Sequence, residues 1–382
     1  MIYEPREDST LLAHQVKRYA KGYVLDIGTG SGIQAVEAAK KKSVKSVLAV
    51  DIQKDVIEHC KSKIKNKKIR FVQSDLFSRI KQKRFNTVVF NPPFLPEDSR
   101  DPDVALDGGK HGYEVIERFL NDVSGYLAED GIILIVFCSF TKQDKVDEII
   151  KDNLLEFSDI SKLHIFFEDL YVYKIEKSMM LKELEKRKIT KIKKLAKGHR
   201  GLIYVGDLEG KKVTIKIKNP ESKAIGRIGN EVKYLKLLNK HKIGPKVLFS
   251  SNEYFVYKFI EGDFIVDYIK NNNKEKIKTV LKDIFNQMYV LDKLKINKEE
   301  MHHPLKHVLV KDRAYLLDFE RCRKTLKPHN VTQFCQFVLS INKLLKNKKI
   351  SVNRNKLINL SKKYKKEQTK KNFNKIISII TK

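Results

Sequence analysis

The first 177 residues alternate between short apolar runs and polar segments of helical spacing, and this alternation most constrains the fold. The apolar runs, rich in Val, Ile and Leu, are 23–28, 46–51, 69–75, 87–94, 131–137 and a final pair within 164–175. The helical segments between and around them are 10–19, 33–41, 55–65, 113–127 and 144–153. Parallel strands covered by helices on both faces have this pattern. The sequence therefore predicts an α/β domain with a doubly wound parallel sheet.

Polar and glycine residues stand where three of these predicted strands end. The first strand leads into Asp26–Gly32 (DIGTGSG), where glycine lets the backbone bend sharply and approach a ligand. The second ends at Asp51, placed to hold ribose hydroxyls in either an NAD or an S-adenosylmethionine protein. The third ends at Asp75-Leu76, where a carboxylate could receive an adenine amino group. Ligands of such sheets bind at the carboxyl ends of strands, so we expect a cofactor site here.

The fourth predicted strand ends in the most specific motif, Asn91–Phe94 (NPPF). Consecutive prolines lock the chain in an extended geometry and remove two N–H donors, which leaves carbonyl oxygens free to accept. The Asn91 side-chain oxygen and the Pro92 carbonyl could then hold one planar NH2 group, with Phe94 stacked on it. Because an amide nitrogen is a poor nucleophile, we expect catalysis by positioning and dipole stabilisation.

Net charge divides the 382 residues into two parts. Residues 1–177 hold 28 Lys+Arg and 28 Asp+Glu, whereas residues 178–382 hold 50 and 19, so the whole excess of +31 lies in the second part. A length of this size suggests two domains, at roughly 100 to 200 residues each. We expect a first domain over 1–177, a linker helix over 178–197 and a second domain over 198–382.

Several classes of protein are excluded by composition. The most apolar stretch, 131–140, is about half as long as a membrane-spanning helix requires. The N-terminus has acidic residues where a secretory signal needs a basic patch, so we expect a cytoplasmic protein without a membrane partner. The four cysteines are far apart, without a CxxC pair or a histidine at metal-ligand spacing, which argues against disulfides and zinc.

Three segments together resemble the HemK/PrmC class of S-adenosylmethionine-dependent protein-glutamine N5-methyltransferases, over residues 1–177. NPPF is the motif of the class, and Tyr3–Ser9 (YEPREDS) and Asp107–Val115 (DGGKHGYEV) are similar to its archaeal and eukaryotic branch. The resemblance implies a Rossmann-like class I methyltransferase fold, S-adenosyl-L-methionine as cofactor, and the glutamine of the GGQ tripeptide in a class I peptide release factor as substrate. It also implies a small zinc-binding activator subunit.

The resemblance further implies roles for single residues. Those that hold the substrate amide would be Asn91, Pro92, Pro93 and Phe94, with Phe94 in place of the commoner tyrosine. Those that bind the cofactor would be Glu7, Asp26, Gly28, Gly30, Gly32, Asp51, Asp75, Leu76 and Asn91.

The second half carries different motifs. A glycine-containing hairpin pattern from Gly198 leads to Lys216 on a predicted strand, Glu231 follows in a helical stretch, and Asp318 comes after an apolar run. A strand lysine, a helix glutamate and a later aspartate in this order bind nucleotide phosphates and magnesium in kinases.

The second half also resembles the small RIO-like kinases and a family of predicted archaeal serine/threonine kinases, through Glu300–Val310 (EMHHPLKHVLV) and Asp318–Arg321 (DFER). The resemblance implies a small protein-kinase-like α+β domain with ATP and Mg2+, in which Asp318 binds the metal. His302 stands where kinases have the catalytic aspartate, and His307 where they have the magnesium-binding asparagine. A nucleotide-binding or ATPase module, or purely structural histidines, therefore remain alternatives.

The tail from Asn342 has apolar residues at helical spacing among many lysines, which predicts one or two amphipathic helices with a basic outer face. Phosphate backbones suit such a face, so ribosome or RNA contact is a further hypothesis. NPPF could serve any planar NH2 group. A nucleic-acid adenine amino-methyltransferase, with the basic half as its RNA-binding or nucleotide-binding module, is thus the alternative to the release-factor enzyme.

Overall fold

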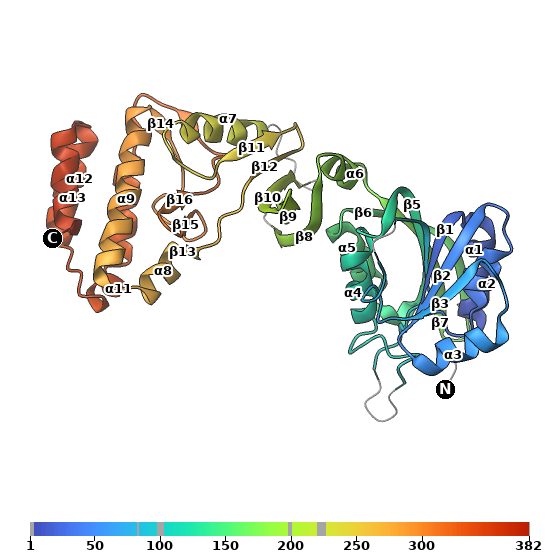
Figure 1. Cartoon of the computed structure of the whole chain (residues 1–382). Helices are drawn as coiled ribbons and strands as arrows, with labels where there is room; N and C mark the ends of the chain where they lie inside the picture. The colour runs from blue at the N-terminus through green and yellow to red at the C-terminus, as the bar shows by residue number, and fades with distance from the viewer. Residues whose placement is uncertain (1–3, 82–83, 98–102, 198–200, 220–226, 382) are drawn as a thin grey trace. The chain divides into compact units, whose positions relative to one another are not determined.

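The computed structural model describes residues 4–81, 84–97, 103–197, 201–219 and 227–381. The chain forms two compact units (Figure 1). The first unit consists of Met1–Lys194 with Asp207–Glu209, and the second of Leu195–Gly206 with Gly210–Lys382.

A seven-stranded sheet forms the centre of the first unit, in the order β3-β2-β1-β4-β5-β7-β6 (Figure 1). Its strands are β1 (Gly22–Ile27), β2 (Val44–Asp51), β3 (Ile69–Gln73), β4 (Phe85–Phe90), β5 (Leu127–Cys138), β6 (Leu155–Ile165) and β7 (Glu168–Lys177). Strands β1 to β5 pair in parallel, as the sequence predicts, whereas β7 is antiparallel to β5 and β6 is antiparallel to β7. The sheet is mixed because two residues connect β6 to β7, too few for the crossover that parallel strands need.

Helices cover both faces of this sheet, and each lies within a few residues of its predicted position. They are α1 (Glu7–Tyr19), α2 (Ile33–Ala39), α3 (Lys54–Lys63), α4 (Glu114–Val123) and α5 (Gln143–Asp152), with the short 3-10 helix η1 (Ser139–Thr141) after β5. Leu12 of α1, Ala35 of α2 and Ile57 of α3 share one apolar cluster with the strands. Phe119 of α4 packs against Phe90 of β4, at 4.7 Å between ring centroids.

The expected linker helix over 178–197 is wrong for its second half. Helix α6 (Met179–Lys186) begins at the Ser178 cap, whose hydroxyl accepts a hydrogen bond from the Leu181 N–H at 3.2 Å. The helix ends before Lys188, which has a φ of 63°, and strand β8 (Ile189–Lys197) follows. The β-branched residues that open this strand favour an extended chain, and pairing with the next strand outweighs the helix propensity of its lysines.

The second unit combines a sheet with a larger helical part. Its five-stranded sheet has the order β11-β12-β10-β9-β8 and adds β9 (Gly201–Leu208), β10 (Lys211–Lys218), β11 (Val247–Ser250) and β12 (Tyr254–Lys258) to β8. The other elements are α7 (Arg227–Asn239), β13 (Asp263–Phe264), α8 (Ile265–Asn271), α9 (Lys274–Lys293), β14 (Ile296–Asn297), β15 (Val308–Val310), β16 (Ala314–Leu316), β17 (Arg323–Lys324) and α10 (Asn330–Ser340). One apolar core joins α7, α9 and α10.

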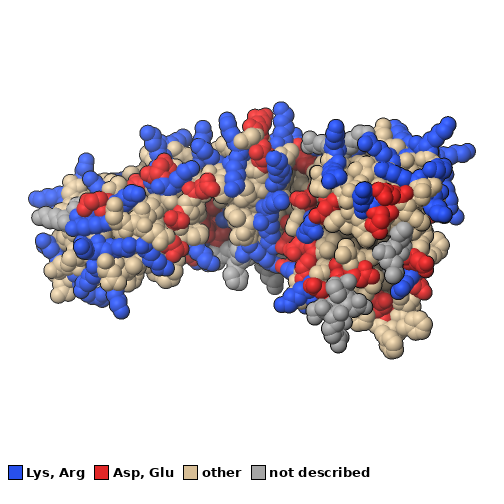
Figure 2. Space-filling view, turned by 60° about the horizontal axis from the view of Figure 1, so that its bottom comes forward, with Lys and Arg blue, Asp and Glu red and all other residues tan. Residues whose placement is uncertain are grey.

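Three tail helices complete this core, where the sequence predicted one or two. They are α11 (Asn342–Asn347), α12 (Arg354–Lys366) and α13 (Lys370–Thr381). Each turns apolar side chains inward, among them Leu345, Leu357 and Ile376, which are fully buried. Lysine is the commonest residue at the other positions, so the predicted amphipathic character is confirmed, and Figure 2 shows Lys and Arg spread widely over the visible surface of the chain.

The four cysteines are buried and unbridged in both units. Burial raises the pKa of the thiol to about 11 for Cys60 and Cys138, and to about 12 for Cys322 and Cys335. In the described ranges no helix is long and apolar enough to cross a bilayer.

Candidate active site

A cavity of about 510 Å³ opens at the carboxyl ends of the parallel strands in the first unit. Its lining brings together four segments that sequence reasoning singled out separately: the glycine turn after β1, the end of β2, the end of β3 and the NPPF loop after β4. The residues of these segments in the wall are Gly28, Gly30, Asp51, Asp75, Leu76, Asn91, Pro92, Pro93 and Phe94. The volume falls within the roughly 300–1,000 Å³ of small-molecule and cofactor sites.

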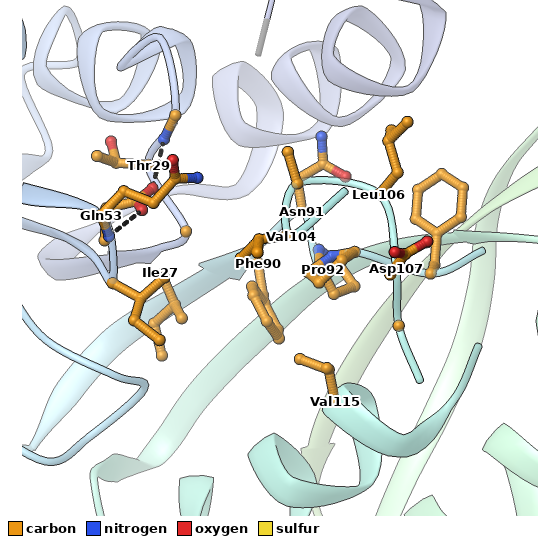
Figure 3. Close-up of a pocket in the computed structure, with 18 of the residues that line it drawn as sticks. Ile27, Thr29, Gln53, Phe90, Asn91, Pro92, Val104, Leu106, Asp107 and Val115 are labelled. Atoms are coloured by element: carbon orange, nitrogen blue, oxygen red, sulfur yellow. Dashed lines mark hydrogen bonds between the residues drawn. The ribbon is translucent and has the colours of Figure 1, made fainter. Parts of the chain in front are cut away.

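Asp51 is fixed by two backbone donors at one end of this cavity. Gly30 N donates to Asp51 Oδ2 and Gln53 N donates to Asp51 Oδ1, each at 3.0 Å, and Figure 3 shows both bonds. Burial raises the pKa of this carboxyl, while the backbone hydrogen bonds act in the opposite direction. The N–H groups hold the carboxylate in one orientation, as binding of a diol requires.

Asp26 and Gly32, which the sequence predicted to bind the cofactor, are not among the described residues that line the cavity. The Thr29 hydroxyl donates to Asp26 Oδ2 at 2.6 Å, and burial raises the pKa of Asp26 to about 7. Gly32 has a φ of 84°, and a Cβ there would lie 2.4 Å from the Ile64 side chain. A glycine is therefore required for the turn to pack on α3.

Asn91 lies near the centre of the cavity lining (Figure 3) and is held by the first helix. Its Nδ2 donates to Asp8 Oδ2 at 2.8 Å and to Ser9 Oγ at 3.3 Å. These bonds direct the amide, so that Oδ1 is left buried and without a hydrogen-bond partner in the described parts of the chain. An unpaired buried acceptor is costly, and a ligand that donates a hydrogen bond here would relieve that cost.

The DGGKHG segment forms the cavity wall beside the NPPF loop. Leu95 N donates to Leu106 O at 3.0 Å, and Gly108 N donates to Leu95 O at 2.9 Å. A Cβ on Gly108 would lie 2.6 Å from Pro93 O, and one on Gly112 would lie 2.5 Å from Phe94 O. Glycine at both places lets the two loops approach closely, and Figure 3 shows Leu106 and Asp107 on one side of Pro92.

Two further predicted cofactor residues have partners or positions that the sequence did not suggest. Asp75 lies in the cavity wall, but it accepts hydrogen bonds from Arg118 Nη2 at 2.8 and 3.1 Å. Glu7 is exposed, and the described lining includes its neighbours Asp8 and Ser9 instead. Sequence reasoning missed Asp8, Ser9 and Arg118 as site residues, although the YEPREDS match pointed to the segment that contains the first two.

The second unit contains a separate cluster of charged groups. Lys216 Nζ of β10 lies 2.6 Å from Glu231 Oε2 of α7 and 3.7 Å from Asp318 Oδ1, which follows β16. Burial alone would lower the pKa of Lys216, but the two carboxylates outweigh it and raise that pKa. Burial likewise works against the ionised form of Asp318, yet Lys216 and Lys298 hold its pKa below the usual value. The three residues that the sequence grouped are thus in contact.

His307 joins this cluster and His302 does not. His307 Nδ1 lies 3.9 Å from Asp318 Oδ2, and its Nε2 lies 3.3 Å from Glu300 Oε2. Possible metal ligands of Glu300, His307 and Asp318 lie within 4.8 Å of one another. His302 is exposed at the protein surface, outside this cluster of described residues. Burial, then Lys298, lowers the pKa of His307, which favours its neutral imidazole.

The first unit is similar in sequence to known methyltransferases. Residues 6–166 match the family model of the methyltransferase small domain. The chain is 34% identical over 178 residues to a protein of Methanocaldococcus jannaschii named as a putative protein N5-glutamine methyltransferase, and the match covers 45% of this chain and 89% of that protein. The chain belongs to the protein N5-glutamine methyltransferase family.

Bacterial relatives match over a shorter part of their length. The release factor glutamine methyltransferase of Streptococcus pneumoniae is 29% identical over 145 residues, which cover 35% of this chain and 51% of that protein. The ribosomal protein uL3 glutamine methyltransferase of Bradyrhizobium diazoefficiens is 32% identical over 121 residues, which cover 28% of this chain and 38% of that protein. The chain therefore spans about half or less of the length of these bacterial relatives.

Methyltransferases of this family imply S-adenosyl-L-methionine as the methyl donor, and the cavity fits such a group. Asp51 offers an oriented carboxylate for a diol at one end. At Gly30 a Cβ would meet nothing closer than 4.0 Å, so the turn leaves space against its backbone. The orphaned oxygen of Asn91 lies beside the same cavity, where an acceptor substrate could bind.

Proposed function

We propose that this protein transfers a methyl group from S-adenosyl-L-methionine to the side-chain amide nitrogen of a glutamine, the one in the GGQ tripeptide of a class I peptide release factor. The observation that carries the proposal is the buried, unpartnered Oδ1 of Asn91 beside the cavity. The Nδ2 of the same side chain is occupied by Asp8, so Asn91 presents an acceptor and not a donor. A glutamine NH2 group is the matching donor.

The chain contributes orientation and electrostatics in this proposal. Asn91 Oδ1 accepts one N–H of the glutamine amide, and the Pro92 carbonyl, in a loop without proline N–H donors, accepts the other. Phe94 stacks on the planar amide. The cofactor, when bound, would supply an electrophilic methyl group: an N–CH3 bond would replace one N–H bond of the NH2 as the S–CH3 bond breaks, S-adenosylhomocysteine would leave, and the displaced proton would pass to solvent. Asp51 and the backbone of Gly28 and Gly30 hold the cofactor, because they line the same cavity. Positioning of this kind offsets the poor nucleophilicity of an amide nitrogen.

The choice of a release factor rests on the family and on the names of relatives. Curated relatives are named as release factor or uL3 glutamine methyltransferases, and both names imply a protein glutamine. The YEPREDS and DGGKHG segments resemble the branch whose substrate is the release factor. We also propose the small zinc-binding activator subunit as a partner, on the same resemblance.

The test is methyl transfer by the purified full chain, with and without the activator subunit. Labelled S-adenosylmethionine is mixed with the intact release factor, the factor with GGQ changed to GGA, ribosomal protein uL3, or RNA. Label in the intact factor alone is the expected result. Label in uL3 would move the substrate to the ribosome, and label in RNA would favour the adenine methyltransferase with the basic half as its RNA contact.

A substitution separates binding from chemistry in this assay. We expect Asn91→Ala to lower kcat about 10²-fold or more while cofactor affinity, measured by calorimetry, is retained, because a positioned group of this kind acts in the transition state. Asn121→Ala is the matched control, since Asn121 is exposed, lies outside the described cavity lining and accepts a hydrogen bond from Asn153. Full activity of Asn91→Ala would contradict the proposed role of NPPF.

For the second unit we propose a kinase-like nucleotide site that binds ATP with Mg2+. The observation that favours it is the contact of Lys216 with both Glu231 and Asp318, from a strand, a helix and a loop. Asp318 and His307 would bind the metal, and His302, which is exposed, would act as base only if substrate binding brought it to the nucleotide. We expect the Lys216→Met variant to lose ATP binding, measured both in the presence and in the absence of Mg2+.

A further inference from the structure

The hairpin between β6 and β7 ends in two bare aromatic side chains. Phe166 and Phe167, which connect the strands, are each 92% exposed. Phe140 in η1 is 51% exposed, and Leu163 on β6 is 37% exposed. Single exposed apolar residues are ordinary on protein surfaces, but adjacent large ones mark interaction sites.

The backbone of the hairpin suggests that these side chains are not there for the turn itself. Phe166 has a φ of 40°, a region in which two-residue hairpin turns prefer Gly, Asn or Asp. A phenylalanine in this conformation is strained and gains no burial in return. Contact with another molecule would account for both the strain and the exposure of these side chains.

Strand register places the tip of the β6–β7 hairpin at the carboxyl ends of the parallel strands, where the cavity opens. Leu170 of β7 pairs with Cys138, the last residue of β5. Strand β5 is parallel to β4, whose carboxyl end leads into Asn91. Phe167 lies three residues beyond Leu170, so the tip extends about 10 Å past the end of β5 at roughly 3.3 Å per residue. The exposed phenylalanine rings and the NPPF loop therefore lie on the same rim of the sheet, the one formed by the carboxyl ends of the parallel strands.

Hydrogen bonds connect this rim to the NPPF loop. Asp169 N, at the base of the hairpin, donates to Ser139 Oγ of η1 at 3.2 Å. Two residues further, the Thr141 hydroxyl donates to Phe94 O at 2.9 Å. Phe140 lies between these two bonds. The hairpin, η1 and the loop that holds the substrate amide thus form one connected edge.

Polar groups surround the apolar ones on the hairpin. Asp169 pairs with Lys162 Nζ at 2.9 Å and with His164 Nδ1 at 2.9 Å. Apolar residues within a polar rim are the composition of a protein-protein interface. Lys162 and His164 are both paired with Asp169, so the arrangement suits a folded protein partner better than a phosphate backbone.

We propose that Phe140, Phe166 and Phe167 form a docking surface for the protein that carries the methylated glutamine. This inference rests on the proposed function and adds to it a recognition site outside the cavity. A protein that presents a glutamine to Asn91 must cross this edge of the sheet, which favours the substrate over a second copy of the chain or an activator subunit as the occupant. The surface binds the body of the substrate, while NPPF binds only its amide.

The experiment compares the double variant Phe166→Ser, Phe167→Ser with the wild-type chain on two substrates: the intact release factor and a short peptide that contains GGQ. For the intact factor we expect KM to rise about tenfold with kcat unchanged, as loss of interface anchors weakens binding. For the peptide, which is too short to reach the rim, kcat/KM should stay the same. Met179→Ser is the matched control, because Met179 is 78% exposed but follows β7 at the opposite edge of the sheet.

Each other outcome is decisive. An unchanged KM for the intact factor overturns the docking surface and leaves the proposed function in place. Equal losses on factor and peptide would assign the phenylalanines a structural role and overturn it as well. Sedimentation could show that the wild-type chain is a dimer and the double variant a monomer, which would make a second copy of the chain the occupant. If the double variant instead lost only the binding of the activator subunit, the activator would be the occupant. If the wild-type chain methylates neither substrate, the proposed function fails, and the docking inference with it.

Discussion

Asn91 and Asp8 are 83 positions apart in the chain, and a hydrogen bond of 2.8 Å joins their side chains beside the cavity. Asp8 is buried in the first helix, and its Oδ2 accepts the hydrogen bond that the Asn91 amide donates. The orientation of Asn91 is therefore set by a residue outside the NPPF motif. Orientation matters here because a rotated amide would present its NH2 group, and not its oxygen, to the substrate.

Asp8→Asn is expected to impair methyl transfer without removing any group that touches the substrate in our proposal. An asparagine at 8 can either donate or accept, so Asn91 loses its directing partner, and misplacement of this kind can cost up to about 10²-fold in kcat. Steady-state kinetics at saturating cofactor measure the loss. Ser9→Ala should cost less, since its bond to Asn91 is longer, at 3.3 Å. Equal effects of the two changes would refute the directing role of Asp8.

Gly112→Ala should displace the NPPF loop from the other side. The new Cβ would lie 2.5 Å from Phe94 O at a φ of 85°, so backbone must move, with a strain of about 1–3 kcal/mol. We expect at least a tenfold loss of kcat, with the fold retained by circular dichroism. Gly125→Ala is the control, because its nearest neighbour would lie at an ordinary 3.6 Å. A fully active Gly112→Ala would show that the loops are not coupled.

Asp26 predicts a pH dependence of stability in the first unit. Burial raises its pKa in the folded state to about 7, well above the ordinary value of an aspartate, so the folded state holds a proton that the unfolded state loses. This contribution is complete below pH 4 and is lost as pH rises toward 7. Asp26→Asn keeps an acceptor for Thr29 but cannot ionise.

The measurement for Asp26 is amide hydrogen exchange of strand β1 at pH 5 and pH 8, corrected for intrinsic rates. Relative to the wild-type chain, the Asp26→Asn variant should be more protected at pH 8 than at pH 5. A difference independent of pH would mean that Asp26 is ionised in the folded protein.

The Lys216–Glu231 pair predicts a non-additive pattern in the second unit. Lys216→Met leaves the buried Glu231 carboxyl without its cation, which costs about 3–5 kcal/mol, whereas Glu231→Leu costs less because Asp318 remains beside Lys216, and replacement of both costs less than the sum of the two. The free energies of unfolding of Lys216→Met, Glu231→Leu and the double variant measure the coupling. Additive losses would indicate that water reaches the pair.

The fold of the first unit was predictable because its signals are local. Each parallel strand is a short apolar run, and Gly28, Asp51 and Asn91 follow strand ends, where the topology brings them together. The Asp8–Asn91 and Asp75–Arg118 pairs were not predictable, because they join distant segments and leave no spacing pattern. His302 was chosen by alignment alone, and an alignment carries no information on exposure.

The segment 189–197 shows the opposite limit. Its lysines and absence of glycine favour a helix, yet it forms the strand β8 at the edge of a sheet. Partner strands decide such cases, and strand propensity depends strongly on that context. The sequence likewise predicted Phe166 and Phe167 only as part of a strand. A sequence pattern does not show which apolar residues remain exposed to solvent.

Because its four native cysteines are buried, the folded chain is suited to labelling at a single introduced cysteine. Thiolates are the species that react with alkylating reagents, and all four thiols have a pKa of about 11 or 12 and are buried in the folded state. A single cysteine introduced in place of Phe167 or Met179 would therefore be modified first in the native protein. A fluorophore or crosslinker could be attached at either edge of the sheet without removing a native residue of the core.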